Sequence, residues 1–246
     1  MQVNAQSSGN VAVILVAAGS GARLGAGRPK AFAPLCGESL LAHALRGVHG
    51  CALVGHVIIV APGSHIDECR EIAALNRVDG EHPRVDVLAG GVDRSASVQA
   101  GLGALRHDDA IVLVHDVARC LAPSDLFARV IQAVRAGHPA VVPGLPVTDT
   151  IKVVDAQGRV LATPDRESLR GIQTPQGFLR EVLEHAHAGA GAGAGANGVS
   201  ATDDAGLVER AGGHVRVVTG DHRALKITSP LDLTLATAML QDGSHA

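Results

Sequence analysis

The chain has 246 residues and a formal net charge of −3 at neutral pH. That length allows a sizeable core and is compatible with one α/β domain that carries a small excursion. Aromatic residues make up only 1% of the chain, and the basic residues are dispersed. Because nucleic-acid-binding surfaces concentrate basic and aromatic side chains, we expect a small-molecule partner and no nucleic acid.

The cysteines are widely spaced and include no CxxC pair: Cys36, Cys51, Cys69 and Cys120. This spacing disfavours a disulfide framework or a zinc site, so we expect reduced thiols. The polar N-terminus lacks the basic segment of a signal peptide, and no apolar run approaches the roughly 20 residues of a membrane helix. These features predict a cytoplasmic protein without a membrane partner. We expect a disordered tail over residues 1–10 and a single domain over residues 11–246.

The first apolar segment, residues 11–16, is rich in β-branched side chains and predicts a buried parallel strand. A glycine-rich stretch follows directly and carries Arg23 and Lys30. Glycines let the backbone approach a ligand with its N–H groups toward anionic oxygens, so this stretch predicts a polyphosphate-binding loop. Neither standard fingerprint fits. Leu24 stands where the dinucleotide motif needs a third small residue, and the Gly-Lys-Ser/Thr ending of a P-loop is missing.

Strand-like and helical segments alternate after this loop. The apolar spacing predicts helices over residues 38–48, 64–75, 93–105 and 123–136, and strands over residues 56–61, 84–88, 110–114 and 140–143. Repeated βα units imply a doubly wound, mostly parallel (Rossmann-like) α/β sheet with helices on both faces. In such a sheet the ligand crevice lies at the carboxyl ends of the strands.

The alternation breaks near residue 148, where two strand-like segments flank a hairpin turn without an intervening helix. We expect an arm over about 148–177. Because an isolated hairpin has little core of its own, the arm should pack against another surface, and we hypothesise a homodimer. The remaining chain predicts a helix over 178–187, a flexible Gly/Ala loop over about 188–200, strands over 214–218 and 224–227, and a final helix beginning at Ser229-Pro230.

Two charged residues lie in apolar surroundings. Asp116 ends a hydrophobic strand, where a carboxylate is costly unless it is paired or bound to a cation such as Mg²⁺. The alternative is that Asp116 caps a turn or pairs with Arg119. Lys226 lies in an apolar strand-like segment and would be desolvated unless it points into the crevice, although a lysine at the edge could simply reach solvent. His115 is interpreted as structural.

The glycine-rich stretch resembles the signature of nucleotidylyltransferases that act on sugar and polyol phosphates. Within that group the chain resembles the 2-C-methyl-D-erythritol 4-phosphate cytidylyltransferase family, over roughly residues 11–240. The motifs that carry the resemblance are, in order, GGVDR at 90–94 with Ser97, VHDVAR at 114–119, DTIK at 149–152, DR at 165–166, QTPQ at 173–176, TDD at 202–204 and LKIT at 225–228. The chain departs from the family pattern at Val92, Val117 and Cys120, which we expect to tune substrate contacts, and its motif at 202–204 has Asp where many relatives have Glu.

The resemblance implies transfer of a cytidylyl group from CTP to 2-C-methyl-D-erythritol 4-phosphate, with Mg²⁺ or another divalent cation as cofactor. It assigns charge stabilisation on the triphosphate to Arg23 and Lys30. It assigns positioning of the attacking phosphate to Lys226 and Arg166, and metal binding to Asp116. Substrate binding is implied for a larger set: Ala17, Ala18, Gly19, Ser20, Gly21, Gly91, Arg94, Ser97, Asp116, Arg119, Thr150 and Thr202.

Two other functions stay open at this point. A ribitol 5-phosphate cytidylyltransferase would share the first loop, and a non-catalytic nucleotide-binding module would share the fold. The Asp165-Arg166 pair and its spacing to Gln173 favour methylerythritol over ribitol. A module that had lost catalysis should lack one of the cations Arg23, Lys30 and Lys226, and all three are present.

Overall fold

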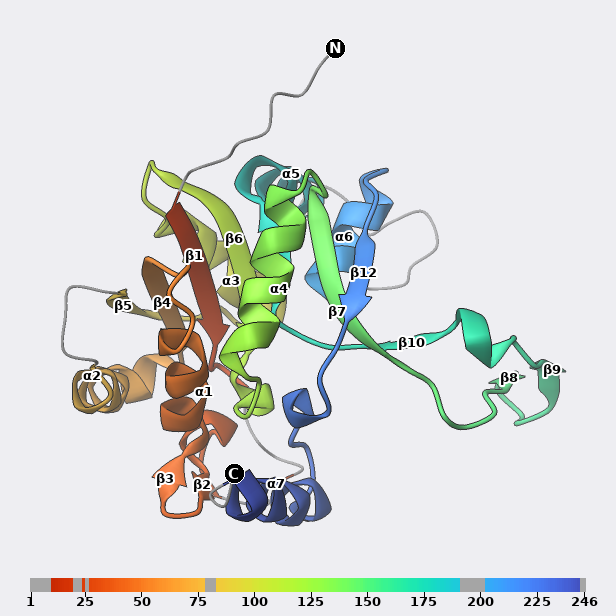
Figure 1. Cartoon of the computed structure of the whole chain (residues 1–246), viewed down its shortest axis with the longest axis horizontal. Coiled ribbons are helices and arrows are strands. Elements are labelled where there is room, and N and C mark those ends of the chain that lie inside the picture. Colours follow the sequence, from red (N-terminus) through yellow and green to blue (C-terminus); the bar gives the residue numbers. More distant parts are fainter. Residues whose placement is uncertain (1–9, 20–23, 25–26, 78–82, 191–201, 244–246) are drawn as a thin grey trace.

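The structure, a computed structural model, describes residues 10–19, 24, 27–77, 83–190 and 202–243. An eight-stranded sheet forms its centre (Figure 1), in the order β10-β7-β11-β6-β1-β4-β5, with β12 also paired to β7. Its strands are β1 (Asn10–Val16), β4 (His56–Ala61), β5 (Arg84–Ala89), β6 (Asp109–Asp116), β7 (Ala140–Pro146), β10 (Arg170–Ile172), β11 (Gln176–Leu179) and β12 (Arg216–Thr219). Four short strands form two small sheets: β2 (Pro34–Leu35) with β3 (Glu38–Ser39), and β8 (Val153–Val154) with β9 (Val160–Ala162).

Most pairs in the main sheet are parallel. Strand β1 runs parallel to both β4 and β6, β5 runs parallel to β4, and β12 runs parallel to β7. Strands β10 and β11 are antiparallel to their neighbours. The mostly parallel sheet predicted from the sequence is therefore confirmed.

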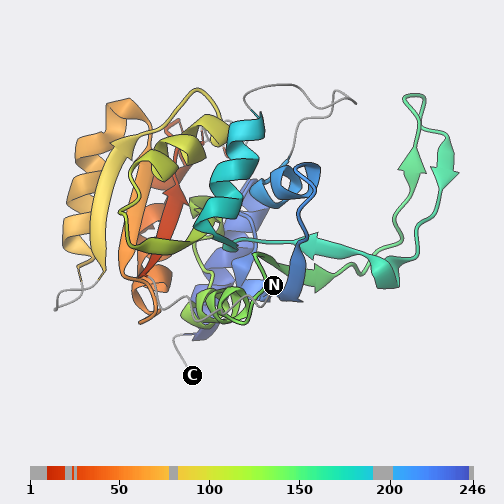
Figure 2. The same cartoon turned by 90° about the horizontal axis from the view of Figure 1, so that it is seen from above.

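Helices cover both faces of this sheet. Figure 2 shows α5, in cyan, and α4, in green, on opposite sides. The helices are α1 (Leu40–His49), α2 (Ile66–Leu75), α3 (Arg94–Gly103), α4 (Ser124–Arg135), α5 (Arg180–Ala190), α6 (Asp204–Arg210) and α7 (Pro230–Gly243). One buried cluster joins the sheet to α1, α2, α4 and α7, and the other joins it to α3, α5 and α6. No helix in the described ranges is long and apolar enough to cross a membrane.

The first strand shows why the sequence folds this way. Val13 and Leu15 belong to one buried cluster and Ile14 to the other, because successive side chains of a strand point to opposite faces. On the Ile14 face, helix α3 approaches so closely that a Cβ on Gly101 would lie 2.7 Å from Ile14 Cγ2. A glycine at that position therefore permits the packing of α3 on the sheet.

The structure corrects several boundaries and adds elements. Residues 176–179, partly assigned to a helix, form β11, which inserts between β6 and β7 before α5 begins. Helix α6 was not predicted. The strand predicted over 224–227 does not form: a 3₁₀ turn (His222–Ala224) is followed at residues 225–227 by chain that is neither helix nor strand. Asn10, which was included in the tail expected over 1–10, begins β1, and residues 188–190 of the Gly/Ala loop expected over about 188–200 belong to α5. The rest of these two predicted segments lies outside the described residues.

The predicted hairpin is present as β8 and β9, and it projects away from the rest of the molecule (Figures 1 and 2). It is shorter than the excursion predicted over 148–177. Strand β10 already pairs with β7, and β11 lies inside the sheet. We therefore define the arm as residues 147–169. Every residue of β8 and β9 is exposed, including Val153, Val154, Val160 and Leu161.

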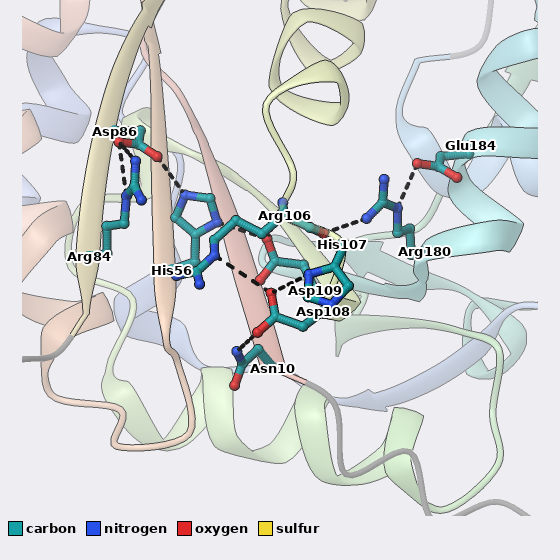
Figure 3. A network of polar contacts seen from close by, with 10 residues as sticks. All are labelled: Asn10, His56, Arg84, Asp86, Arg106, His107, Asp108, Asp109, Arg180 and Glu184. Carbon is teal, nitrogen blue, oxygen red and sulfur yellow. Dashed lines mark hydrogen bonds and ion pairs between the residues drawn. The ribbon is translucent and has the colours of Figure 1, made fainter.

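A polar network lies at the amino-terminal ends of the parallel strands, opposite the edge where β1 and β6 end at Val16 and Asp116 (Figure 3). The buried ring of His56 lies between two carboxylates. Its Nδ1 is 2.8 Å from Asp109 Oδ2, and its Nε2 is 3.0 Å from Asp86 Oδ2. Asp109 also accepts a hydrogen bond from the backbone N–H of Arg106, and Arg84 donates to Asp86.

This network predicts that the stability of the fold depends on pH. Burial disfavours the charged imidazolium, but hydrogen bonds and charges from Asp109 and Asp86 outweigh that effect and raise the pKa of His56. Its stabilising contribution is complete below the unfolded pKa and is lost as pH rises through the folded pKa, with about 1.4 kcal/mol for each unit of difference. We expect the free energy of unfolding, measured with denaturant, to decline between pH 5 and pH 9 in the unsubstituted protein. His56→Gln should lack this decline. An equal decline in both proteins would contradict this assignment, and the NMR titration of His56 gives a second measurement.

Candidate active site

A cavity of about 390 Å³ opens at the carboxyl ends of the central strands. The register of β1 and β6 places Asp116 directly opposite Val16, where both strands end. The lining comes from the loop after β1, the loop after β5, the end of β6 and the segment that precedes α7. The lining residues are Val16, Ala17, Ala18, Gly19, Lys30, Ala31, Gly91, Val92, Asp93, Arg94, Asp116, Val117, Ala118 and Lys226.

The glycine-rich loop is fixed at both described ends. The Ala17 N–H donates to the Val60 carbonyl of β4, and the Lys30 N–H donates to the Gly19 carbonyl. Lys30 begins a 3₁₀ turn whose Phe32 is buried, so this turn is anchored in the core while Lys30 lines the cavity. The predicted site residues Ser20, Gly21 and Arg23 lie outside the described residues.

Asp116 is at the centre of the charged groups in the cavity, with only 8% of its surface exposed. Lys226 Nζ donates to Asp116 Oδ2 at 2.8 Å, and Arg94 Nε donates to Oδ1 at 3.1 Å. Burial by itself would raise the pKa of Asp116, but the charges of Arg94 and Lys226 outweigh it and hold the pKa well below its usual range. Asp116 is therefore ionised, and its ion-pair partners are Arg94 and Lys226. The sequence predicted that a carboxylate at this strand end would be paired or bound to a cation.

Lys226 reaches this carboxylate from a part of the chain that is distant in sequence. The Ile227 N–H donates to the Ala118 carbonyl, and the buried side chains of Ala224 and Ile227 hold the segment against the core. The lysine side chain is 43% exposed and forms part of the cavity lining. The expectation that Lys226 points into the crevice holds, whereas its assignment to a strand was wrong.

Gly90 and Gly91 form the turn that follows β5. A Cβ on Gly91 would lie 2.3 Å from Ala96 Cβ, and one on Gly90 would lie 2.8 Å from Ser97 Oγ. Only glycines let this turn approach the start of α3. Ser97 is fully buried behind the turn, and its hydroxyl donates to the Asp93 carbonyl. Ser97 therefore supports the cavity wall and does not line the cavity.

The other predicted residues lie outside the cavity lining. Arg119 donates to the Ala224 carbonyl at 2.7 Å and to the Ile172 carbonyl at 3.1 Å, so it joins the segment of Lys226 to β10. Thr150 and Arg166 are exposed on the arm, where Arg166 donates to the Thr148 carbonyl. Thr202 is exposed just before α6. Their contacts with a substrate stay predictions.

His115 is fully buried and hydrogen-bonded to the Thr174 hydroxyl. Burial lowers the pKa of His115 to about 4, so the ring is neutral near pH 7. Sequence reasoning gave no role to Asp204, although it noted the motif at 202–204. Asp204 Oδ2 lies 2.7 Å from Arg94 Nη1, which ties α6 to the cavity.

Comparisons with known proteins identify the family of this chain. The model of the 2-C-methyl-D-erythritol 4-phosphate cytidylyltransferase family matches residues 11–242. A curated protein of that name from Rhodococcus jostii (strain RHA1) is 47% identical over 241 residues, which are 98% of this chain and 100% of the relative. The chain belongs to the 2-C-methyl-D-erythritol 4-phosphate cytidylyltransferase family.

Solved structures of this cytidylyltransferase family have the same fold. The 4-diphosphocytidyl-2C-methyl-D-erythritol synthase from Anaerococcus prevotii DSM 20548 is 29% identical and superposes with a TM-score of 0.82, covering 95% of this chain and 96% of that one. The cytidylyltransferase from Thermus thermophilus is 35% identical with a TM-score of 0.72, covering 94% and 99%. The Rossmann-like sheet predicted from the sequence is thus the fold of the cytidylyltransferases.

Proposed function

We propose that this protein transfers the cytidylyl group of CTP to 2-C-methyl-D-erythritol 4-phosphate, releasing pyrophosphate in isoprenoid precursor synthesis. The observation that carries this proposal is the arrangement of Lys30, Arg94 and Lys226 around one cavity at the carboxyl edge of the sheet. Full-length relatives carry the same activity in their names. The ribitol phosphate activity and the non-catalytic module are not favoured, since the family match extends over residues 11–242.

The reaction explains why the cavity gathers positive side chains. An oxygen of the acceptor phosphate attacks the α-phosphorus of CTP, and pyrophosphate leaves from the opposite side. Both reactants are anionic, so the rate depends on positioning them and on neutralising charge in the transition state. We assign Lys30 and Arg23 to the triphosphate and Lys226 to the attacking phosphate. No side chain needs to remove a proton, because the acceptor phosphate is already ionised.

The donor set of the cavity is compatible with Mg²⁺. Among the described residues, no three His, Cys, Asp or Glu side chains gather in a metal-binding group. Mg²⁺ is usually held by one or two carboxylates together with substrate phosphates and water, and Asp116 supplies an anionic carboxylate in the cavity wall. We propose that Asp116 holds Mg²⁺ together with the phosphates of CTP, where the ion would neutralise phosphate charge.

The cytoplasmic location that the sequence predicts for this protein stays a prediction.

We further propose that the arm, residues 147–169, forms a homodimer. The reason is its exposed apolar surface: Val153, Val154, Val160 and Leu161 are all on β8 and β9, a two-stranded sheet without a core of its own. A second subunit would cover these side chains. In such a dimer, Thr150 and Arg166 would reach the acceptor phosphate of the neighbouring active site.

Charged substitutions in the arm should therefore separate the subunits. We expect the double variant Val160→Asp, Leu161→Asp to be a monomer by light scattering and to use the acceptor poorly, with little change in CTP binding. Leu75→Asp is the control, because Leu75 is 85% exposed on α2, away from the arm. A dimer that survives the double substitution would place the interface elsewhere.

The proposed reaction is tested by incubating the purified protein with CTP, Mg²⁺ and one acceptor at a time. We expect pyrophosphate release with 2-C-methyl-D-erythritol 4-phosphate and little with ribitol 5-phosphate. Faster release with ribitol 5-phosphate would change the assigned substrate. Binding of CTP without release in any mixture would indicate a nucleotide-binding module.

A further inference from the structure

A chain of charged side chains leads from the cavity into the protein interior. Lys226 pairs with Asp116, and Asp116 pairs with Arg94. Arg94 then pairs through Nη1 with Asp204 Oδ2 at 2.7 Å. The other carboxylate oxygen, Asp204 Oδ1, lies 2.9 Å from Nε2 of the buried His187. Arg94 is thus held between one aspartate in the cavity wall and another behind it.

Asp204 is itself firmly placed. Only 1% of its surface is exposed, and it is the first residue of α6. Gln176 of β11 fixes the start of that helix: its side-chain amide donates to Asp203 Oδ2 and its side-chain oxygen accepts from the Ala205 N–H. Helix α5, which carries His187, is tied to α3 by a bond from Gln99 to the His187 carbonyl.

This arrangement decides how the guanidinium of Arg94 is used. Arginine prefers to grip one carboxylate with two parallel hydrogen bonds. Here the guanidinium is divided instead, with Nε on Asp116 and Nη1 on Asp204, so Asp116 Oδ2 is left for Lys226. Without the Asp204 charge, Arg94 could turn both of its donors onto Asp116 and compete with Lys226.

We infer that Asp204, supported by His187, is a positioning residue that holds Arg94 so that Asp116 and Lys226 keep the geometry used for the reaction. This inference rests on the proposed cytidylyltransferase function. Neither Asp204 nor His187 lines the cavity, so each acts through Arg94 and touches no substrate. The buried carboxylate is stable there because the guanidinium compensates its charge.

The test is a double-mutant cycle between Arg94 and Asp204. Asp204→Asn should lower kcat by between about 10- and 100-fold. This is about the range, 10- to 100-fold, seen when the residues that hydrogen-bond to metal ligands are removed. Any change in its KM for CTP should be no larger than the change in Arg94→Ala, because Asp204 acts only through the arginine. In an Arg94→Ala background, Asp204→Asn should cause no further loss of kcat, since its effect passes through the arginine. Losses that multiply independently, or an unchanged kcat in Asp204→Asn, would overturn the inference.

The molecule supplies a matched control. Asp109 is an equally buried aspartate paired with a histidine, His56, at the opposite ends of the strands. Asp109→Asn should lower the melting temperature and leave kcat unchanged. If it lowered kcat as much as Asp204→Asn, the effect would be one of general stability and the inference would be wrong. His187→Gln, which keeps a donor near Asp204, should retain more activity than His187→Leu.

Failure of the proposed function would be recognised separately. Pyrophosphate release by the unsubstituted protein tests that function directly. The coupling between Arg94 and Asp204 also has a readout without catalysis, because Asp204→Asn should restore melting temperature in the Arg94→Ala background, where it removes a buried carboxylate that has lost its arginine partner. Additive effects on melting temperature would overturn the coupling whatever the protein catalyses.

Discussion

Replacing Lys226 by alanine is expected to lower kcat about 10²-fold or more, as when one preorganised charge-stabilising contact is removed. Lys226 lines the cavity, and the core packing of Ala224 and Ile227 holds its backbone there. Its ammonium group therefore needs to move little during the reaction. The fold should survive, because the side chain is 43% exposed and fills no core space. Single-turnover pyrophosphate release at saturating CTP measures the effect.

The control for Lys226→Ala is Arg70→Ala. Arg70 forms an ion pair with Asp67 at 2.8 Å on the surface of α2, so this variant removes a cation and an ion pair without touching the cavity. Surface pairs of this kind contribute little to stability. Near-normal turnover in Lys226→Ala, with Arg70→Ala unchanged, would remove Lys226 from the catalytic machinery.

Replacing Asp116 by asparagine should have the second large effect, a loss of kcat of about 10²-fold or more. The substitution keeps the shape of the side chain but removes the charge that both Arg94 and Lys226 share, so two cations would face each other across a neutral amide. We expect affinity for Mg²⁺ in the presence of CTP to fall as well, if the carboxylate is a ligand. Activity titrated against Mg²⁺ gives both quantities.

The pH dependence separates Asp116 from other contributions. The depressed pKa of Asp116 keeps the carboxylate ionised in the folded protein at all working pH values. Its ionic contribution to stability is present above the unfolded pKa, about 3.9, and is lost only as pH falls through the lower folded pKa. Activity between pH 6 and pH 9 should therefore show no titration of Asp116. A step in that range that disappeared in Asp116→Asn would contradict this assignment.

The cations that matter come from separate parts of the chain. Lys30 follows the first loop, Arg94 begins α3, and Lys226 precedes α7. One buried aspartate, Asp116, pairs with two of them, Arg94 and Lys226, and its negative charge offsets the repulsion between these two cations. The cavity is thus already arranged for anionic reactants, and little side-chain reorganisation is needed at the moment of reaction.

The sequence by itself determined the elements that depend on local patterns. The apolar run of β1, the amphipathic helices and the hairpin turn at residues 155–158 each follow from neighbouring residues, and the structure confirms them. The ordered motifs also identified the family. Asp116 was recognised as a site residue because a carboxylate at the end of an apolar strand needs a cation nearby.

Only the tertiary structure decided which residues meet. Strand β11 forms because it pairs with both β6 and β7 in the sheet. The sequence of a four-residue segment does not predict such long-range pairing. The apolar neighbours of Lys226 predict a strand. In the structure these neighbours instead anchor a loop in the core. The pairing of Arg94 with both Asp116 and Asp204 joins three segments through space. Local patterns report the burial of a segment, but the partner of a buried charge is set by how the segments pack.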